Sequence, residues 1–228
     1  MKENKEEEIL GFLQERKYAE VGELAAKLYL SASTVRRRLT ELEKKGLVTR
    51  AHQNSLEKKK IALTAIKLIK NGDVVFLDGS TSAFFIAEYL SEFDNLKVVT
   101  NGIDTLSLLS KNNVTAYSTG GIVSPVNRSV LIGHFAAEMI AGIHADIAFF
   151  SAQSAGRDGV ISDCFEEENV LRLCMMKNAS KKVFLCDGAK FEKQSAFRLC
   201  SVRDIDCIVS NRDIRDHFDT DALPELLY

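Results

Sequence analysis

The first fifty positions of the chain carry apolar residues at the three- and four-residue spacings of amphipathic helices. The members of the first two runs are Ile9, Leu10, Leu13, Val21, Leu24, Ala25 and Leu28. A tight break at 29–31 follows, and the hydroxyl of Ser31 is suited to accept a hydrogen bond from a first-turn amide. We therefore predict a third helix from Ala32 to about Lys45, ended by Gly46.

After residue 56 the pattern changes to short, wholly apolar runs that alternate with helical segments. The runs of strand length are Val74–Leu77, Val98–Val99, Val114–Tyr117, Ile147–Phe150, Val183–Cys186 and Cys207–Val209. The helical segments between them are 82–91, 103–111, 134–142 and 165–178. Apolar strands that alternate with helices indicate a buried, largely parallel sheet. We therefore expect a helical domain over 1–55 and a larger α/β domain with a mainly parallel sheet over 56–228.

The third predicted helix has two chemically different faces. Val35, Leu39 and Leu42 form its apolar stripe, and hydroxyl and basic side chains occupy the opposite face. These side chains are Ser33, Arg37, Thr40 and Lys44, with Thr34 and Arg36 on the flanks. Arginine can bind guanine or phosphate, and short hydroxyls reach bases or backbone. A helix-turn-helix motif consists of short helices joined by a tight turn, with a basic helix that binds DNA, and this segment has that layout. The pattern therefore predicts DNA binding. The alternative is that the basic face of the helix is only exposed to solvent.

The segment 47–52 is predicted to be a short strand that forms a wing, with Arg50 and His52 near the phosphate backbone. Lys58–Lys60 either adds non-specific phosphate contacts or forms part of a solvated linker. The complete set of predicted DNA-binding residues is Ser31, Ser33, Thr34, Arg36, Arg37, Thr40, Arg50 and His52.

Charge is distributed unevenly along the chain. Residues 1–60 contain 14 lysines and arginines against 10 acidic residues, whereas the remainder contains 16 against 22. Within the first part, residues 27–60 hold 10 basic and 3 acidic side chains. A basic segment joined to an acidic body is typical of a polyanion-binding module attached to a domain with another task.

The N-terminal motif resembles the DeoR family of bacterial repressors. The resemblance rests on the pattern Ser31-x-x-Thr34-Val35-Arg36-Arg37-x-Leu39-x-x-Leu42-x-x-x-Gly46-x-x-x-Arg50-x-His52. The chain departs from the family pattern at Arg38, where an acidic residue is usual, and at Gln53-Asn54, where a glycine pair is usual. The resemblance implies a winged helix-turn-helix that binds a double-stranded DNA operator.

Polar residues follow the predicted strands at the points where ligands bind in parallel sheets. In the first of these loops, Gly79 precedes three hydroxyl residues at a helix start, which suits a phosphate, although the spacing is not that of a Walker A loop. Helix capping in an ordinary α/β domain is the alternative for any single loop. Several such loops at one edge predict a site for a small anionic ligand. Its residues are Asp78, Gly79, Ser80, Thr81, Ser82, Thr100, Asn101, Gly120, Gly121, Asp187 and Lys190.

This second part of the chain also resembles the DeoR effector domain, which is related in fold to ribose-phosphate isomerases. The matching segments are Asp78–Ser82, Val99–Asn101, Gly120-Gly121, Gly133 and Asp187–Phe191. The resemblance implies a phosphorylated sugar as the effector, with its phosphate on Gly79–Ser82. Asp78, Asn101 and Asp187 would then face the hydroxyls, and Lys190 either the hydroxyls or the phosphate.

Composition limits the class and location of the protein. The chain is 46% hydrophobic and 27% charged, which is ordinary for a soluble globular protein. Its N-terminus is charged, and no apolar run approaches the roughly 20 residues that cross a bilayer. The five cysteines form no C-x-x-C pair, which predicts reduced, mostly buried thiols. We therefore expect a cytoplasmic protein with no membrane partner, no metal and no cofactor.

Three functions remain open from the sequence. The first is a DNA-binding repressor of a sugar-metabolism operon, controlled by a phosphorylated sugar and assembled as a homodimer or higher oligomer. The second is a sugar-phosphate isomerase-like enzyme with an accessory basic domain, in which Asp78, Asp187 and Lys190 act as acid and base. The third is a sugar-phosphate-binding protein without DNA activity. No Ser-His-Asp pattern supports catalysis, so we predict a regulator and not an enzyme.

Overall fold

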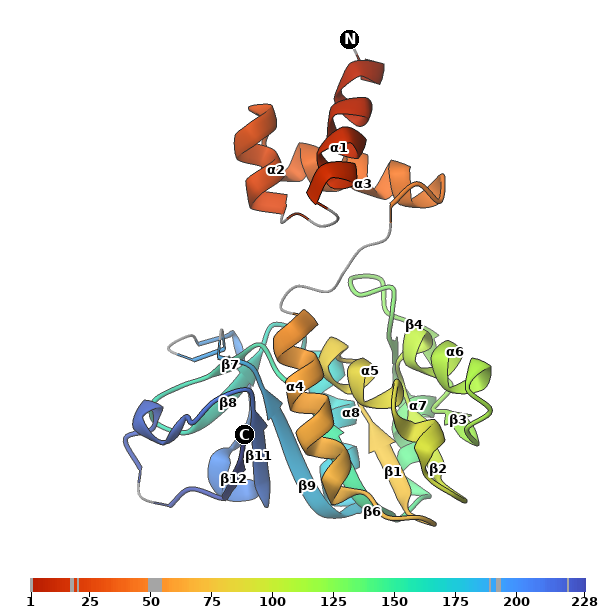
Figure 1. Ribbon diagram of the computed structural model, residues 1–228. Helices are drawn as coiled ribbons and strands as arrows, with labels where there is room; N and C mark the ends of the chain where they lie inside the picture. The colour runs from red at the N-terminus through yellow and green to blue at the C-terminus, as the bar shows by residue number, and fades with distance from the viewer. Residues whose placement is uncertain are drawn as a thin grey trace. The chain divides into compact units, whose positions relative to one another are not determined.

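The computed structural model describes residues 2–16, 19, 21–48, 55–188, 190–191, 194–220 and 222–228. The chain forms two compact units, Met1–Ser55 and Leu56–Tyr228. The first is helical, and the second is an α/β unit (Figure 1). In the described part of the chain, no helix is both long enough and apolar enough to span a membrane.

The described residues of the N-terminal unit form three helices, namely α1 (Lys2–Arg16), α2 (Val21–Leu28) and α3 (Ala32–Lys44). Their apolar faces meet in one core that comprises Ile9, Phe12, Leu24, Leu28, Val35 and Leu42. Val35 and Leu42 are fully buried, and Leu39 packs against the same core. The apolar stripe predicted for the third helix is therefore confirmed.

The connection between α2 and α3 has the length and capping expected from the sequence. The amide of Thr34 donates to Oγ of Ser31 at 3.2 Å, so Ser31 caps the N-terminus of α3. At the other end, Gly46 adopts a φ of +69°, and the amide of Leu47 donates to the carbonyl of Leu42.

The predicted wing is not seen as a strand at Leu47 and Val48, and its remaining positions, 49–52, lie outside the described residues.

The α/β unit is built on a seven-stranded sheet in which all neighbouring strands are parallel. Its strands are β1 (Val74–Leu77), β2 (Lys97–Thr100), β3 (Ala116–Ser118), β6 (Ala145–Phe150), β9 (Ala179–Cys186), β11 (Cys207–Ser210) and β12 (Glu225–Leu227). Their spatial order is β12-β11-β9-β6-β1-β2-β3. A helical domain followed by a mainly parallel α/β domain is the predicted fold class, which is confirmed.

Both faces of this sheet are covered, because alternate residues of each strand point to opposite sides. Val75 and Leu77 join a core with α4 (Ser55–Ala65), α5 (Thr81–Ala87) and α6 (Ile103–Lys111), whereas Phe76 joins α7 (His134–Ala141) and α8 (Glu166–Lys177) (Figure 1). Beyond α8, Phe150 and Phe184 pack against a small antiparallel sheet. That sheet has the order β10 (Phe197–Ser201), β8 (Val160–Asp163) and β7 (Ser154–Ala155).

Short elements complete the unit. The strands β4 (Ile122–Val123) and β5 (Leu131–Ile132) form a hairpin between β3 and α7. Single 3₁₀ turns follow or precede the longer elements at Ile66–Leu68, Leu90–Glu92, Val202–Asp204 and Arg215–His217.

Several predicted boundaries differ from the structure. The strands expected at Ile147–Phe150 and Val183–Cys186 begin earlier, at Ala145 and Ala179. The strand expected at Val114–Tyr117 begins two residues later, because the amide of Val114 donates back to the carbonyl of Leu109 and closes the end of α6. The helix expected over 82–91 ends at Ala87 and continues as the separate turn Leu90–Glu92.

The strand order places a topological switch point between β1 and β6. The chain proceeds from β1 through β2 to β3 on one side, and from β6 through β9 and β11 to β12 on the other. Because the strands are parallel, their carboxyl ends meet at one edge, which we call the strand-end edge. Ligands of open α/β sheets bind outside this edge at the switch point.

Candidate functional sites

The first candidate site is the exposed face of α3. Arg37 is exposed, and Thr34 and Thr40 are half-buried, on the helix whose Val35 and Leu42 are buried. Ser33 and Arg36 belong to the same helix, although their side chains lie outside the described part, as do Arg50 and His52 altogether.

Ser31 has a structural contact that accounts for its presence at the start of this face. Its Oγ accepts the amide of Thr34 and lies 2.8 Å from Oγ1 of the same residue. The pair therefore fixes the first turn of α3 and carries hydroxyl groups at the helix N-terminus.

The second candidate site is the strand-end edge, where Asp78 joins the two strands of the switch point. Its carboxylate is 1% exposed. Oδ1 accepts the amide of Ser80 at 3.1 Å, and Oδ2 accepts the amide of Ser151, which follows β6, at 3.1 Å. Oγ of Ser80 in turn accepts the amide of Ala83 and caps α5. Asp78 therefore shapes the loop that follows β1.

The loops after β1 and β2 pack backbone to backbone. A Cβ on Gly102 would lie 3.2 Å from Cα of Gly79, and a Cβ on Gly79 would lie 2.2 Å from Cγ1 of Val130. The amide of Gly102 donates to Oγ1 of Thr100, and Nδ2 of Asn101 donates to the carbonyl of Leu131. The predicted residues Gly79, Thr100 and Asn101 are thus brought together.

Two polar atoms, one in the first turn of α5 and one in the loop after β2, are buried without a partner in the described part of the chain. Ser82 is 1% exposed and Asn101 is 3% exposed, and neither Oγ of Ser82 nor Oδ1 of Asn101 has a hydrogen-bond partner among the described residues. An unsatisfied buried polar atom costs about 1–3 kcal/mol, so each calls for an explanation such as a bound water, ion or ligand.

The glycine pair after β3 has a backbone conformation that other residues rarely adopt. Gly120 and Gly121 have φ values of +65° and +97°. A Cβ on Gly121 would lie 2.4 Å from the carbonyl oxygen of Ile132, whereas a Cβ on Gly120 would meet nothing within 4 Å. Gly121 therefore permits the close approach of the β4–β5 hairpin to the strand-end edge.

Asp187 and Lys190 follow β9, the second strand from β1. Nζ of Lys190 donates to Oγ of Ser151, which also donates to the carbonyl of Leu185. Nζ of Lys58, on α4, lies 3.8 Å from Oδ2 of Asp187, and both side chains are buried. Burial lowers the pKa of Lys58, while Asp187 raises it and Lys190 lowers it. The solvated-linker interpretation is therefore wrong for Lys58, although Lys59 and Lys60 are exposed.

A buried charge cluster behind this edge was missed from the sequence. The guanidinium of Arg172, which is 5% exposed, donates to three carboxylates: to Oδ2 of Asp78 at 2.9 Å, to Oδ2 of Asp163 at 3.2 Å and to Oε2 of Glu168 at 2.8 Å. Burial alone would lower the pKa of Arg172, but the carboxylates raise it. Burial raises the pKa of Glu168 against the opposing effects of Arg172 and Asn127. The i, i+4 spacing of Glu168 and Arg172 was the available signal.

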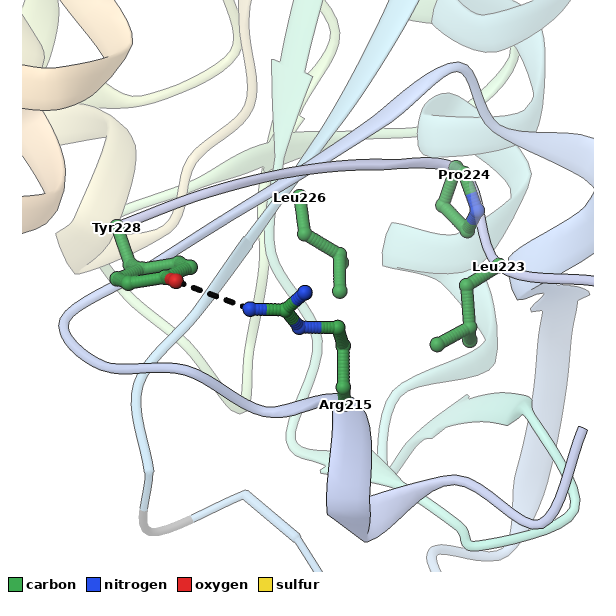
Figure 2. Close-up of a pocket in the computed structure, with 5 residues that line it drawn as sticks. All are labelled: Arg215, Leu223, Pro224, Leu226 and Tyr228. Atoms are coloured by element: carbon green, nitrogen blue, oxygen red, sulfur yellow. Dashed lines mark hydrogen bonds between the residues drawn. The ribbon is translucent and has the colours of Figure 1, made fainter. Parts of the chain in front are cut away.

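A shallow open pocket lies elsewhere, around the outermost strand β12 (Figure 2). It has a volume of about 470 Å³ and is lined by Arg215, Leu223, Pro224, Leu226 and Tyr228. Nη2 of Arg215 donates to the hydroxyl of Tyr228 at 3.1 Å across it. None of the predicted site residues lines this pocket.

Two family models match consecutive parts of the chain. The model of the DeoR-like helix-turn-helix domain matches residues 5–54, and the model of the DeoR C-terminal sensor domain matches residues 53–212. The chain belongs to the DeoR family. It is thus a DNA-binding transcriptional regulator with a sensor domain, and the family predicted from its motifs is confirmed.

Curated relatives of this DeoR-family chain match along nearly its whole length. The transcriptional regulator GolR of Listeria innocua is 30% identical over 92% of this chain and 91% of its own. The L-fucose operon activator of Haemophilus influenzae is 29% identical over 93% of each chain. The transcriptional repressor GlcR of Bacillus subtilis is 28% identical over 90% of this chain and 86% of its own. All three relatives are regulators of transcription.

Two solved structures align with the chain at low identity, and the first of them shares the α/β fold. The β subunit of eIF2B from Chaetomium thermophilum aligns with a TM-score of 0.52 and 12% identity, over 84% of this chain and 61% of its own. Ribose 5-phosphate isomerase A from Methanocaldococcus jannaschii aligns with a TM-score of 0.45 and 18% identity, over 60% of this chain and 55% of its own. The chain thus spans less than two thirds of either protein.

The described residues hold no group of three or more His, Cys, Asp or Glu side chains that could bind a metal. All five cysteines are free, and three of them, Cys186, Cys200 and Cys207, are buried.

Proposed function

We propose that this DeoR-family regulator represses a sugar-metabolism operon and that a phosphorylated sugar, bound at the strand-end edge, controls it. In this proposal residues 1–55 are the DNA-binding domain and residues 56–228 are the effector domain. Both repressors and an activator occur among the relatives. Two of the relatives are named after sugars, as an L-fucose operon activator and a lactose phosphotransferase system repressor.

The exposed face of α3 supports the DNA-binding part of the proposal. Arg37 extends from the side of the helix opposite Val35 and Leu42, and the hydroxyls of Ser31 and Thr34 stand at the helix N-terminus. A recognition helix places its N-terminal residues against base edges, so we assign Ser33, Thr34, Arg36, Arg37 and Thr40 to DNA. Arg50 and His52 are assigned to the phosphate backbone.

The observation that carries the effector site is the pair of buried oxygens that lack a partner among the described residues, Oγ of Ser82 in the first turn of α5 and Oδ1 of Asn101 after β2. Ser82 lies in the first turn of α5, directly after the loop that follows β1, and Asn101 lies in the loop after β2. Ligands of open α/β sheets bind at such positions beside the switch point. A ligand that hydrogen-bonds both residues would satisfy atoms that the protein leaves unsatisfied.

Most of the predicted residues have a role in this site, whereas Thr100 and Asp187 contact Gly102 and Lys58 of the protein itself. Gly79–Ser82 hold the phosphate, Asn101 and Lys190 contact the sugar, and Gly120-Gly121 line the rim beside the hairpin. Asp78 is better placed as a positioning residue, because both of its oxygens already accept protein donors. The same contacts make Asp78 a poor general base, which weighs against the isomerase-like enzyme.

The DNA-binding part is tested by titrating the protein onto its own upstream region at several salt concentrations. Replacing Arg36 and Arg37 by alanine should weaken binding sharply and reduce the slope of log K against log[salt] by about 0.9 for each phosphate that is no longer neutralised. Arg198→Ala removes an exposed arginine from β10 and serves as the control. Unchanged affinity in the double variant would contradict the assignment of α3.

The effector part is tested by a thermal-shift screen of sugar phosphates on the full chain. A compound that raises Tm in the wild type should lose its effect in Thr81→Asp, because a carboxylate would face the phosphate. Thr115→Asp is the matched control, since Thr115 is likewise an exposed threonine and precedes β3 at the opposite end of that strand. Equal Tm shifts in both variants would exclude Gly79–Ser82 as the phosphate site, and turnover of the compound would favour an enzyme.

Assembly follows from the mode of DNA binding. Helix-turn-helix proteins usually bind paired half-sites as dimers, so we propose a homodimer or a higher homo-oligomer. Light scattering coupled to size-exclusion chromatography tests this: a monomer at the concentrations that saturate the operator would contradict it.

A further inference from the structure

The first turn of α4 is attached to the rest of the α/β unit by a charged side chain. Among the side chains of this turn that the structure describes, Leu56 is 73% exposed and Glu57 is half-buried, whereas Lys58 is buried. The next buried positions, Ile61 and Ala62, lie one turn further along the helix and belong to the main core. Lys58 is therefore the described side chain that holds the start of this helix against the unit.

The partner of Lys58 lies at the strand-end edge. Nζ of Lys58 is 3.8 Å from Oδ2 of Asp187, which directly follows β9, and both side chains are buried. Removing one partner of a buried ion pair leaves the other charge uncompensated. Lys59 also pairs with Glu88, at 3.9 Å, but both of these side chains are partly exposed, and exposed ion pairs contribute little. We call the Lys58–Asp187 pair the α4 anchor.

A series of contacts joins the α4 anchor to the candidate effector site. The amide of Lys190 donates to the carbonyl of Asp187 at 3.1 Å, and Nζ of Lys190 donates to Oγ of Ser151. The amide of Ser151 donates to Oδ2 of Asp78, whose other oxygen accepts the amide of Ser80 in the loop after β1. The first turn of α4 is thus connected to the switch point through the loops that follow β9, β6 and β1.

The charge of Lys58 depends on its neighbours in this series. Burial lowers the pKa of Lys58, Asp187 raises it, and Lys190 lowers it again, because a second ammonium disfavours the charged form. An anion in contact with Lys190 would offset the charge of that residue and reduce its repulsion of Lys58. The attraction between Lys58 and Asp187 would then hold the first turn of α4 more firmly.

We propose that Lys58 reports occupancy of the effector site: the negative charge of a bound sugar phosphate offsets Lys190, strengthens the α4 anchor and holds the first turn of α4 more firmly. Along the chain, that turn directly follows the segment that leads from the N-terminal unit. A ligand controls a distant activity only by favouring one arrangement over another, and the held and released forms of this turn are two such arrangements. This inference rests on the proposed effector site and adds the residue through which the site acts.

Hydrogen exchange on the full chain tests the α4 anchor without any sugar. In an α-helix the amides of Lys59–Ala62 donate to the carbonyls of the first turn, so their exchange reports its opening. Lys58→Met should speed this exchange at least about fivefold, because the released turn opens more often. Lys60→Met removes an exposed lysine from the same helix, changes the net charge equally and should leave the exchange unchanged. Equal exchange in the two variants would overturn the inference.

A second variant keeps the test valid if the uncompensated carboxylate of Asp187 prevents Lys58→Met from folding. Lys58→Met/Asp187→Asn removes both charges of the α4 anchor, so no buried charge is left without its partner. It should show the same faster exchange of Lys59–Ala62. Exchange at the wild-type rate in the double variant would overturn the inference.

Sugar phosphates test the response to occupancy. The probes are glucose 6-phosphate, fructose 6-phosphate, ribose 5-phosphate and inorganic phosphate, and calorimetric titration of the full chain shows which of them bind. A probe that binds should slow the exchange of Lys59–Ala62 at least about twofold in the wild type and in Lys60→Met. It should bind Lys58→Met with similar affinity and leave the exchange of that variant unchanged.

Operator affinity separates this inference from the effector proposal on which it rests. A bound probe should change operator affinity in the wild type and in Lys60→Met, but not in Lys58→Met. Equal changes in all three proteins would overturn the role of Lys58 while leaving the effector site intact. Absence of binding by all four probes would overturn the effector proposal itself.

Discussion

Nε of Arg172 donates to Oδ2 of Asp78 at 2.9 Å, across 94 residues of sequence. The contact joins the middle of α8 to the loop after β1, and the same carboxylate accepts the amide of Ser151. Arg172 therefore helps to position Asp78 at the candidate effector site from the interior of the α/β unit, where it is not exposed to a ligand. Its removal would leave three buried carboxylates without their cation.

Replacing Arg172 by methionine should destabilise the α/β unit by about 3–5 kcal/mol, because breaking a buried ion pair leaves uncompensated charge in the interior. Denaturant unfolding followed by far-ultraviolet circular dichroism measures this change. Arg198→Met, on the exposed side of β10, should change the free energy of unfolding by less than about 0.5 kcal/mol. Similar stabilities of the two variants would show that the cluster contributes nothing to folding.

The loss of unfolding free energy in Arg172→Met should depend on pH. Burial raises the pKa of Glu168 above its ordinary value, so the folded state binds this proton more tightly than the unfolded state. Stability from Glu168 is then fully present below the unfolded pKa and is lost as pH rises through the folded pKa. Loss of Arg172 raises the pKa of Glu168 further. The difference in unfolding free energy between the variant and the wild type should therefore become smaller as the pH is lowered from about 8 to about 5. A difference that grows on acidification would contradict this account.

The two glycines after β3 allow a comparison within one turn. Both Gly120→Ala and Gly121→Ala introduce a side chain at positive φ, but only the Cβ at position 121 would collide with the carbonyl of Ile132. Gly121→Ala should therefore lower the free energy of unfolding by at least about 1 kcal/mol more than Gly120→Ala. Equal losses would indicate that the hairpin moves away at no cost.

The capping hydroxyl of Ser31 should matter for the N-terminal unit. Ser31→Ala removes the acceptor of the Thr34 amide and should cost about 1 kcal/mol, whereas Ser31→Asp retains an acceptor and should cost less. Thermal unfolding of the two variants, followed by helical circular dichroism, provides the measurement. A stable alanine variant together with a destabilised aspartate variant would argue against capping.

Thiol reactivity should distinguish the cysteines by burial. Burial raises the pKa of the Cys186, Cys200 and Cys207 thiols to about 12, so that almost no thiolate is available at pH 8. Iodoacetamide should label exposed Cys164 first and Cys174 more slowly, as read by mass spectrometry of peptides. All five should react in denaturant, and rapid labelling of Cys207 in the native protein would contradict the structure.

Local patterns account for the parts of the fold that the sequence predicts well. β1 and α6 occupy the expected ranges, and Ser31 and Gly46 end α3 where their capping chemistry places them. These features depend on residues within one turn or one apolar run. The loops at the strand-end edge were predictable for the same reason, because each directly follows an apolar strand.

Long-range contacts account for the structural features that could not be predicted from the sequence. Arg172 and Lys58 carry charges that normally indicate a surface, and only their distant partners Asp78 and Asp187 make burial tolerable. The strands β4, β5 and β7 contain two residues each, too few for an alternating pattern to appear.

Coupling between the two units is the central claim, and operator affinity measured by fluorescence anisotropy tests it most directly. The titration is carried out with and without a saturating sugar phosphate that raises Tm. The account predicts at least about a fivefold change in affinity, in either direction, for the wild type and none for Thr81→Asp, whose affinity without the sugar stays at the wild-type value. Equal operator affinities of the wild type with and without the bound sugar phosphate would contradict the claim.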